Sequence, residues 1–256
     1  MDSKSTVMTT TLQELKTSTH LLDEYQGALP MEDIRKTHNL FKREIIEAIT
    51  IGRDNPVVLD VGCGFGGDLQ KWKHAGVRNL SMCDPSSTAL DEAKRRSEGL
   101  KMRVNFYEGD IRGCPKNRTY DIICYNFSLH YIFASEKLFH ESVREIKKRM
   151  KHGGTLAGII PDSETVIMRT PYQDTLGNFF VMKATPQGGF GEKLFVNLVD
   201  TPYYEDGAKS EPVAYKDRLV TTLENYGFYL VHWEPLTGHE VTQMYSKFIF
   251  TYYNKR

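Results

Sequence analysis

A strand-like apolar run that leads directly into a glycine turn is the feature that most constrains the fold of this chain. Residues 57–61 read Val-Val-Leu-Asp-Val, and residues 62–68 read Gly-Cys-Gly-Phe-Gly-Gly-Asp before a helical spacing of apolar residues begins. Valine-rich runs of this length are typical of strands buried in a parallel sheet. Gly62 and Gly64 permit positive φ and let a ligand approach the backbone, and Gly67 lets the helix lie close to the strand. The segment predicts a nucleotide-type site, for which G-x-G-x-x-G alone is weak evidence.

The acidic residues around this turn favour a cationic ligand over a dinucleotide. Asp84 ends the next strand-like run about twenty residues after the glycines, where a carboxylate can bind the ribose diol of NAD or of S-adenosylmethionine. Asp60 and Asp68 would repel a pyrophosphate but attract a sulfonium and an ammonium. Asp110, after a third strand-like run, either accepts from an adenine amino group or caps a turn. The set predicts S-adenosylmethionine as cofactor, S-adenosylhomocysteine as product and no metal.

Length and composition predict a single domain. A chain of 256 residues with 40% hydrophobic residues can build a sizeable core, and no linker divides it. We expect residues 1–16 to be a flexible N-terminal tail and residues 17–256 to be one methyltransferase domain, with an insertion at about 170–212.

Charge and cysteine usage narrow the functional classes. Lysine plus arginine and aspartate plus glutamate both count 33, so a nucleic-acid substrate would have to be bound locally. The four cysteines contain no C-x-x-C pair, which favours buried free thiols over zinc ligands or disulfides. No run approaches the ~20 apolar residues of a membrane span, and the N-terminus shows no apolar signal-peptide core. These features predict no membrane partner.

Alternating strand and helix patterns predict a mostly parallel, doubly wound sheet. The predicted helices are residues 36–51, 68–75, 86–97, 135–150 and 216–226. The predicted strands are residues 57–61, 80–83, 102–107, 120–127, 155–160, 179–182, 194–199, 229–233 and 247–252. Gly153-Gly154 would end the fourth helix, residues 179–199 would form a small antiparallel insertion, and the last two strands would form an antiparallel C-terminal edge. This is the Rossmann-like, class I S-adenosylmethionine-dependent methyltransferase fold.

A cluster of aromatic and imidazole side chains lies where the fourth strand of the predicted sheet ends. Residues 126–133 read Asn-Phe-Ser-Leu-His-Tyr-Ile-Phe. Ligands of such sheets bind at the carboxyl ends of the strands, so these rings would lie beside the methyl group and could hold a planar base by stacking. Alternatively, the same rings simply pack against the next helix.

Together these motifs resemble the mRNA cap guanine-N7 methyltransferase family, from about Thr17 to the C-terminus. The run Phe127 to Phe133 matches the family's aromatic signature ending in His-Tyr-x-Phe, and residues 158–162 match its Gly-x-x-Pro-Asp. Residues 35–42, with Arg35 and Lys42 at their ends, are similar to the family's Arg…Asn-Asn-aromatic-x-Lys helix. Residues 240–248 are similar to the segment that carries a cap-binding tyrosine. The chain resembles the methyltransferase domains of large DNA viruses more than cellular enzymes.

The resemblance implies two groups of site residues. The donor would be bound by Lys42, which reaches its carboxylate, and by Asp60, Gly62, Gly64, Asp68, Asp84, Asp110, Asn126, Phe127 and Tyr131. The cap would be bound by His38, Asn39, Arg112, His130, Pro161, Glu211 and Tyr245. His130, Glu211 and Tyr245 would position the guanine, and no residue would act as acid or base, because guanine N7 carries no proton.

Some positions depart from the family pattern. The family's Pro-Glu-aromatic motif aligns with Thr201-Pro202-Tyr203, where tyrosine replaces the glutamate. Glu211-Pro212, however, lies at the family's distance before the next helix, so Glu211 is assigned as the guanine-binding acid. Composition alone would favour a solvated loop acid there. Phe65 replaces a basic residue of the glycine turn and His38 replaces an asparagine. For the phosphate bridge this leaves Arg112, Arg35 and Lys71 as candidates.

The predicted reaction is methyl transfer from S-adenosylmethionine to N7 of the cap guanine by in-line displacement. The predicted partners are 5'-capped RNA (GpppN) and other capping domains, a triphosphatase or guanylyltransferase, of the same polypeptide. The expected location is cytoplasmic (virion or viral factory) for a viral protein and nuclear for a cellular one. A small-molecule methyltransferase and a catalytically silent cap-binding or regulatory module stay open. A NAD enzyme is disfavoured, because no acid-base set accompanies the glycines.

Overall fold

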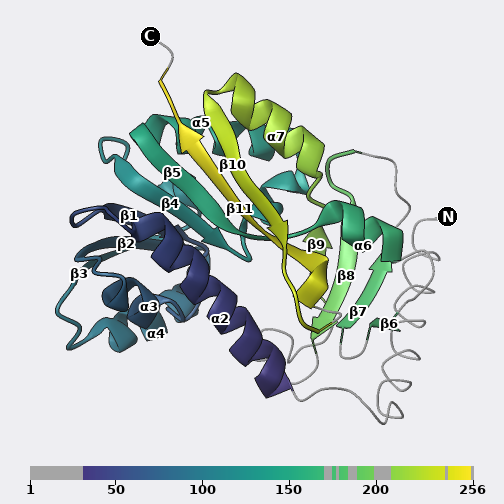
Figure 1. Ribbon diagram of the computed structural model, residues 1–256, viewed down its shortest axis with the longest axis horizontal. Coiled ribbons are helices and arrows are strands. Elements are labelled where there is room, and N and C mark those ends of the chain that lie inside the picture. Colours follow the sequence, from purple (N-terminus) through teal and green to yellow (C-terminus); the bar gives the residue numbers. More distant parts are fainter. Residues whose placement is uncertain are drawn as a thin grey trace, which may run out of the picture.

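A seven-stranded sheet forms the centre of the molecule, as the computed structural model shows (Figure 1). The structure describes residues 31–169, 175–176, 179–183, 189–198, 209–239 and 242–254, so the tail predicted at residues 1–16 lies outside it. The sheet order is β10-β11-β5-β4-β1-β2-β3. Its strands are β1 (Val57–Val61), β2 (Asn79–Asp84), β3 (Arg103–Glu108), β4 (Tyr120–Asn126), β5 (Met150–Pro161), β10 (Phe228–Pro235) and β11 (Tyr245–Tyr252).

The prediction of a mostly parallel sheet with an antiparallel C-terminal edge is confirmed. Strands β1 to β5 pair in parallel, whereas β11 runs antiparallel to both of its neighbours, β5 and β10. The last strand of the chain is therefore inserted beside the outermost one. Because the parallel strands share one direction, their carboxyl ends meet at one edge, where Asp84 and Asn126 are the final residues of β2 and β4.

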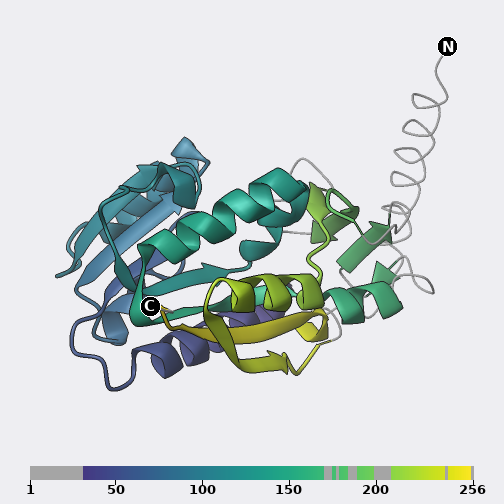
Figure 2. The same ribbon diagram turned by 90° about the horizontal axis from the view of Figure 1, so that it is seen from above.

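Helices cover both faces of this sheet (Figure 2). On one face, α2 and α3 pack Ile45, Ile46 and Trp72 against β1, β2 and β4. On the other, α5 and α7 pack Phe139 and Leu223 against the same sheet. The helices are α2 (Met31–Thr50), α3 (Leu69–His74), α4 (Ser87–Ser97), α5 (Glu136–Arg149), α6 (Ser163–Arg169) and α7 (Lys216–Asn225), with 3-10 turns η1 (Ile111–Gly113), η2 (Leu129–Ala134) and η4 (Thr242–Met244).

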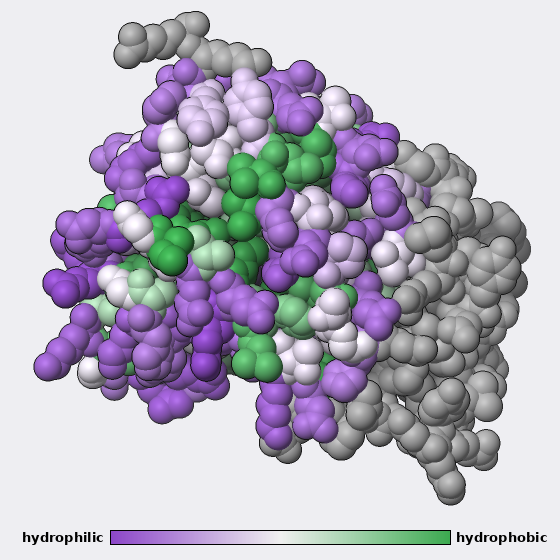
Figure 3. Space-filling model, viewed as in Figure 1, coloured by the Kyte–Doolittle hydropathy of each residue, from purple (hydrophilic) through white to green (hydrophobic). Residues whose placement is uncertain are grey.

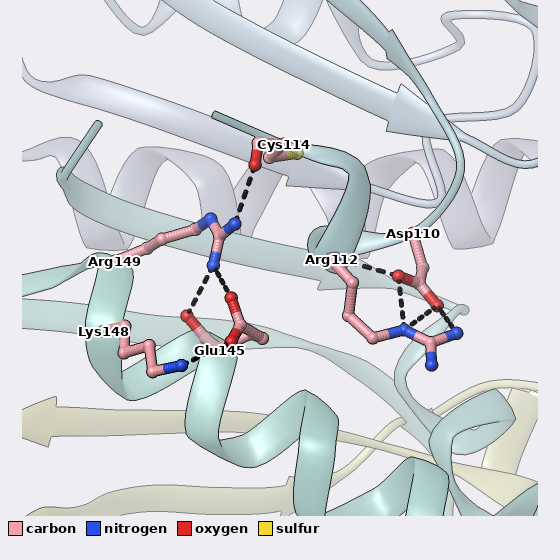
Figure 4. Close-up of polar contacts among 6 residues, drawn as sticks. All are labelled: Asp110, Arg112, Cys114, Glu145, Lys148 and Arg149. Carbon is pink, nitrogen blue, oxygen red and sulfur yellow. Dashed lines mark hydrogen bonds and ion pairs between the residues drawn. The ribbon is translucent and has the colours of Figure 1, made fainter. Parts of the chain in front are cut away.

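The helix α5 ends within one residue of the prediction, but the signal assigned to its end was wrong. The helix stops at Arg149 and β5 begins at Met150, so Gly153-Gly154 lie inside the strand rather than at a helix end. Arg149, the last residue of the helix, makes a buried contact at this junction. Its guanidinium, fully buried, donates to the Cys114 carbonyl at 2.7 Å and pairs with Glu145 one turn back (Figure 4). The contact ties the end of α5 to the loop that follows β3.

A second, four-stranded antiparallel sheet lies beside the first, in the order β6-β7-β8-β9. Its strands are β6 (Thr175–Leu176), β7 (Phe179–Lys183), β8 (Lys193–Leu198) and β9 (Lys209–Pro212). The sequence predicted β7 and β8 but missed β6, β9 and the helix α6. The backbone N–H of Gly191 donates to the Phe133 carbonyl at 3.0 Å, which joins the small sheet to η2 of the main domain. Residues 201–203, the site of the alternative alignment, lie outside the described residues.

The cysteine prediction is confirmed, because Cys63, Cys83, Cys114 and Cys124 are all free thiols and all but Cys63 are buried. Within the described ranges, no helix is both long and apolar enough to cross a bilayer. Over the same residues, no group of three or more histidine, cysteine or acidic side chains is arranged to hold a metal ion.

The outer strand β10 leaves one edge of the large sheet open. Its side chains Tyr229, Leu230 and Val231 are exposed, and Val231 is 62% accessible. Figure 3 shows hydrophobic residues gathered on this side of the molecule. A β-bulge between Leu230 and His232 interrupts the pairing with β11, a device that makes an edge strand a poorer template for a further strand.

Candidate active site

Two adjoining cavities open at the carboxyl edge of the parallel strands. The larger has a volume of about 680 Å³ and the smaller about 470 Å³. They share Gly62, Pro85, Ser128 and Tyr131 as lining residues. The smaller cavity also contains His38, Lys42, Gly64, Asp84, Asn126, Phe127, His130, Glu211 and Tyr245. Residues predicted for the donor and for the cap therefore line one continuous space.

The glycine turn brings bare backbone to this space. Gly62 and Gly64 have φ values of +72° and +50°, which L side chains rarely adopt. A Cβ on Gly62 would lie 2.4 Å from the Ser128 Cβ, so the turn and the end of β4 touch there. At Gly64 a Cβ would meet nothing within 4 Å, which leaves room for a ligand. At Gly67, predicted to let the following helix lie close to the strand, a Cβ would meet only the Lys42 Nζ at 3.9 Å, whereas at Gly66 a Cβ would crowd Ala93 of α4.

Asp84 braces the turn from the neighbouring strand. One carboxylate oxygen accepts from the Gly64 backbone N–H at 2.8 Å, and the other accepts from the Ser86 backbone N–H at 2.9 Å. Both oxygens keep a further lone pair, and the side chain borders the smaller cavity. Its predicted place at the end of β2 is confirmed, and its carboxylate faces the space in which a ribose would be bound.

Asp68 lies beneath the turn, held by two lysines and an amide. Its Oδ1 is 2.9 Å from the Lys42 Nζ and 2.8 Å from the Lys71 Nζ, and its Oδ2 accepts from the Asn126 Nδ2 at 3.0 Å. Burial opposes ionisation of Asp68, but the two ammonium groups outweigh it and lower its pKa to about 2. Lys71 is thereby committed to Asp68 rather than to a phosphate, which argues against its predicted alternative use at the phosphate bridge.

Asp60 is the second buried acid of this cluster. Its Oδ2 accepts from the indole Nε1 of Trp72 at 2.9 Å. Burial and the nearby charge of Asp68 raise the pKa of Asp60 to about 7. The two acids therefore differ in protonation. Asp68 stays ionised at neutral pH, whereas the pKa of Asp60 lies close to neutral pH, so Asp60 can gain or lose a proton there. Neither acid lines a cavity, although both were predicted to touch the donor.

Asp110 and Arg112 lie together at the larger cavity (Figure 4). The Arg112 guanidinium bonds both carboxylate oxygens of Asp110, with the closest contact at 2.7 Å, and also reaches Glu141 at 3.0 Å. Hydrogen bonds and the charge of Arg112 hold the pKa of Asp110 below its usual range, against the effect of burial. Arg112 was predicted with the cap residues, but its two carboxylate partners place it on the side of the larger cavity, away from Glu211.

Three rings form one wall of the smaller cavity. His38 stacks on Phe127 with ring centroids 5.0 Å apart, and Tyr245 meets both rings edge-on. Phe127 directly follows β4 and adopts φ +61°, a backbone conformation that is uncommon for an aromatic residue. In this conformation its ring lies against those of His38 and Tyr245. Burial and the nearby Lys42 lower the pKa of His38 to about 4, so its imidazole is neutral at physiological pH.

Glu211 closes the opposite side of the cavity from the small sheet. It lies in β9 and is 7% exposed, so it is not a solvated loop acid. Its Oε1 accepts from the Tyr131 hydroxyl at 3.3 Å, and its Oε2 lies 3.2 Å from the His130 Nε2. Within the described part of the chain, neither ring nitrogen of His130 has a well-aligned hydrogen bond. Burial and the carboxylate of Glu211 raise the pKa of Tyr245.

Like Asp60 and Asp68, two of the residues predicted for the cap line neither cavity. Asn39 is exposed on α2, one position beyond the cavity-lining His38. Pro161 ends β5 and pairs with Tyr245 in the sheet, so it supports the wall rather than lining it. The sequence in turn missed Ser128, whose hydroxyl donates to the Val61 carbonyl at 2.5 Å, and Trp72, which holds Asp60. The helical spacing around Trp72 indicated a core position but not this polar contact.

Residues 14–182 match the family described as the mRNA (guanine-N(7))-methyltransferase domain. The chain belongs to this family. Among its relatives in this mRNA cap guanine-N7 methyltransferase family, the Candida glabrata enzyme is 32% identical over 224 residues, 81% of this chain and 51% of its own. The Schizosaccharomyces pombe enzyme is 29% identical over 164 residues, 58% of this chain and 46% of its own. Both are named mRNA cap guanine-N(7) methyltransferase, and the chain spans about half their length.

Solved structures agree on the fold of this family member. The N-methyltransferase NodS from Bradyrhizobium japonicum superposes with a TM-score of 0.59 at 13% identity, covering 85% of this chain and 97% of NodS. The glycopeptide N-methyltransferase MtfA, solved with S-adenosyl-L-homocysteine, gives 0.57 at 14% identity, covering 84% and 89%. The predicted fold, the Rossmann-like class I S-adenosylmethionine-dependent methyltransferase fold, is confirmed.

Proposed function

We propose that this chain is an S-adenosylmethionine-dependent mRNA cap guanine-N7 methyltransferase acting on 5'-capped RNA. One observation carries the proposal. The smaller cavity joins a bare glycine turn and the acid of β2 to a buried glutamate flanked by histidine and tyrosine. The first set suits a nucleoside-like methyl donor and the second suits a guanine. Membership of the family supports this pairing of substrates.

The residues around the glycine turn fit the donor. Asp84 offers carboxylate lone pairs to a ribose diol, and Gly62 and Gly64 remove the side chains that would block its approach. Lys42 faces the same cavity with an ammonium group suited to a carboxylate. Asn126 Oδ1 is buried and lacks a partner among the described residues, so it is an acceptor ready for the donor's amino group. Asp110 would accept a hydrogen bond from the adenine amino group if Arg112 gave up part of its contact with this carboxylate.

Glu211 supplies the specificity for guanine. A buried carboxylate can accept hydrogen bonds from guanine N1–H and from the 2-amino group, which adenine cannot offer together. A base that left Glu211 unsatisfied in this buried place would be rejected strongly. The Tyr131 hydroxyl donates to one oxygen of the carboxylate, the His130 Nε2 lies 3.2 Å from the other, and Tyr245 lines the same cavity.

No residue has to remove a proton from the substrate. S-adenosylmethionine, when bound, supplies a methyl group on a positively charged sulfur. Guanine N7 has a lone pair and carries no proton, so the work of the protein is to align N7 with that methyl group. Glu211 and the faces of Phe127 and Tyr245 lie where positive charge would spread onto the base, and they would favour it electrostatically.

Methyl transfer to differently capped RNAs tests the proposal. The purified chain is incubated with radiolabelled S-adenosylmethionine and RNA that is GpppG-capped, uncapped or already N7-methylated. We expect label only on the first, recovered as 7-methylguanine after nuclease digestion. Transfer to a metabolite with no activity on capped RNA would indicate a small-molecule methyltransferase. Binding of capped RNA without donor binding would indicate a silent regulatory module.

A further inference from the structure

We infer that Lys71 is a positioning residue that keeps Asp68 paired while Lys42 moves from Asp68 to the donor's carboxylate. The inference rests on the proposed function, because it concerns the amino-acid end of the donor. It assigns a role in ligand exchange to a lysine that lines neither cavity.

Two lysines share a single carboxylate oxygen. The Nζ atoms of Lys42 and Lys71 lie 2.9 Å and 2.8 Å from the Oδ1 of Asp68. If one of these two ammonium groups left, Asp68 would still keep the other as a direct partner. One of the two lysines is therefore available for another task.

The two lysines differ in what they can reach. The Lys42 side chain is 19% exposed, projects from α2 and lines the smaller cavity. The Lys71 side chain is 9% exposed, lines neither cavity and also donates to the Gly67 carbonyl at 2.8 Å, within its own turn of chain. Lys42 is therefore the partner that can turn to a ligand, and Lys71 is the partner that stays.

The exchange needs Lys71 because Asp68 is 7% exposed at its side chain. Removing the sole partner of a buried charge is strongly unfavourable, whereas removing one of two is not. With Lys71 in place, Lys42 can leave Asp68 at little cost. Without Lys71, the same carboxylate would retain Lys42, and the donor's carboxylate would find no free ammonium group.

The charges of the cluster balance before and after the exchange. Asp60 and Asp68 face Lys42 and Lys71, so two acids meet two bases. The amino-acid end of the donor is a zwitterion, which adds one ammonium and one carboxylate. Lys42 would pair with the new carboxylate, Lys71 would stay on Asp68, and the new ammonium would compensate Asp60. With Asp60 ionised, the exchange therefore buries no net charge.

Calorimetry with two ligands separates this role from general damage. S-adenosylhomocysteine carries the amino-acid end, and 5'-methylthioadenosine lacks it. For Lys71→Met we expect the Kd of S-adenosylhomocysteine to rise at least tenfold and that of methylthioadenosine to stay within twofold. Lys71→Arg should restore most of the affinity, and Lys73→Met, an exposed lysine of the same helix, should change neither. A purely structural defect would weaken both ligands together.

The wild-type complex gives a second test that needs no variant. In a crystal structure with S-adenosylhomocysteine, Lys42 should contact the ligand carboxylate and Lys71 should still contact Asp68. A complex in which Lys42 stays on Asp68, or equal loss of both ligands in Lys71→Met, would overturn the inference. Failure of the wild-type chain to bind S-adenosylhomocysteine at all would overturn the proposed function instead.

Discussion

Glu211 Oε2 lies 3.2 Å from His130 Nε2, and this contact joins two sheets that are separate in the fold. Glu211 comes from β9 of the small sheet, whereas His130 follows β4 of the large one. Both side chains are buried, at 7% and 2% exposure. The end of the smaller cavity that holds Glu211 and His130 is thus assembled where the two sheets meet.

Glu211→Gln should lower kcat/KM for capped RNA by about 10- to 100-fold, the range expected for losing a hydrogen bond to a charged group. The amide keeps the shape of the side chain but presents an N–H group to guanine donors. Donor affinity should be unchanged, because Glu211 lies across the cavity from the glycine turn. Steady-state kinetics and calorimetry with S-adenosylhomocysteine measure the two effects. Glu164→Gln, an exposed acid, is the control.

Gly62→Ala should destabilise the fold more than Gly64→Ala. Both positions have positive φ, which costs an alanine about 1–2 kcal/mol. Only at Gly62 would the new Cβ also meet Ser128 at 2.4 Å, so a further ~1–2 kcal/mol of strain is expected there. Chemical denaturation of the two variants gives the comparison. Equal losses would mean that the turn and the end of β4 are not in tight contact.

Arg149→Met should cost about 1–3 kcal/mol, because it leaves the Cys114 carbonyl without its buried donor and removes one of the two cations that pair with Glu145. Lys148→Met is the matched control. Lys148 pairs with the same Glu145 at 2.8 Å but is 65% exposed, so its loss should cost less than about 1 kcal/mol (Figure 4). Thermal unfolding of both variants checks the difference. A similar melting temperature for the two would contradict a structural role for the buried guanidinium.

We expect Asp60 to release a proton when the donor binds. Its pKa is raised to about 7, above the ordinary 3.8, so without ligand this carboxyl lowers stability as the pH rises from about 4 to 7. An incoming ammonium group would favour the ionised form. Affinity for S-adenosylhomocysteine should then rise about tenfold from pH 6 to pH 8 and level off above pH 7.

Binding enthalpies in phosphate and Tris at pH 7 should differ if this proton is released, because Tris takes it up with a larger heat. Asp60→Asn should abolish the difference. His38 does not contribute to the difference in binding enthalpy, because its pKa is lowered to about 4 and its imidazole stays neutral from pH 6 to pH 8. Identical enthalpies for the wild type in the two buffers would show that Asp60 does not titrate on binding.

The parallel half of the fold was predictable because local signals and tertiary packing agree there. The valine run of β1 and the glycines after it specify a strand and turn with little help from elsewhere. The sequence placed the end of α5 within one residue but wrongly assigned the stop to Gly153-Gly154. It also did not reveal the contact of the buried Arg149 with Cys114, because no local pattern encodes a contact over that distance along the chain. It also missed β9, a four-residue strand defined by pairing with β8.

For the site, the sequence predicted which residues gather but not how they pair. Lys42, Asp84, Asn126 and Tyr131 line the cavity as expected. The charge pairing behind that surface was not foreseen, because Asp68 is bonded by a second lysine and Asp60 by an indole. Arg112 was assigned by its place along the chain, whereas its side chain is directed by Asp110 and Glu141. Side-chain direction depends on neighbours that are remote in sequence.

The small sheet leads directly into α7, with Glu211 only five residues before Lys216, the first residue of that helix. Glu211 therefore reaches the smaller cavity on a piece of chain that is separate from the glycine turn and from β2. Substitutions within β9 would change the acidic side of this cavity while leaving the backbone of the glycine turn and the carboxylate of Asp84 as they are.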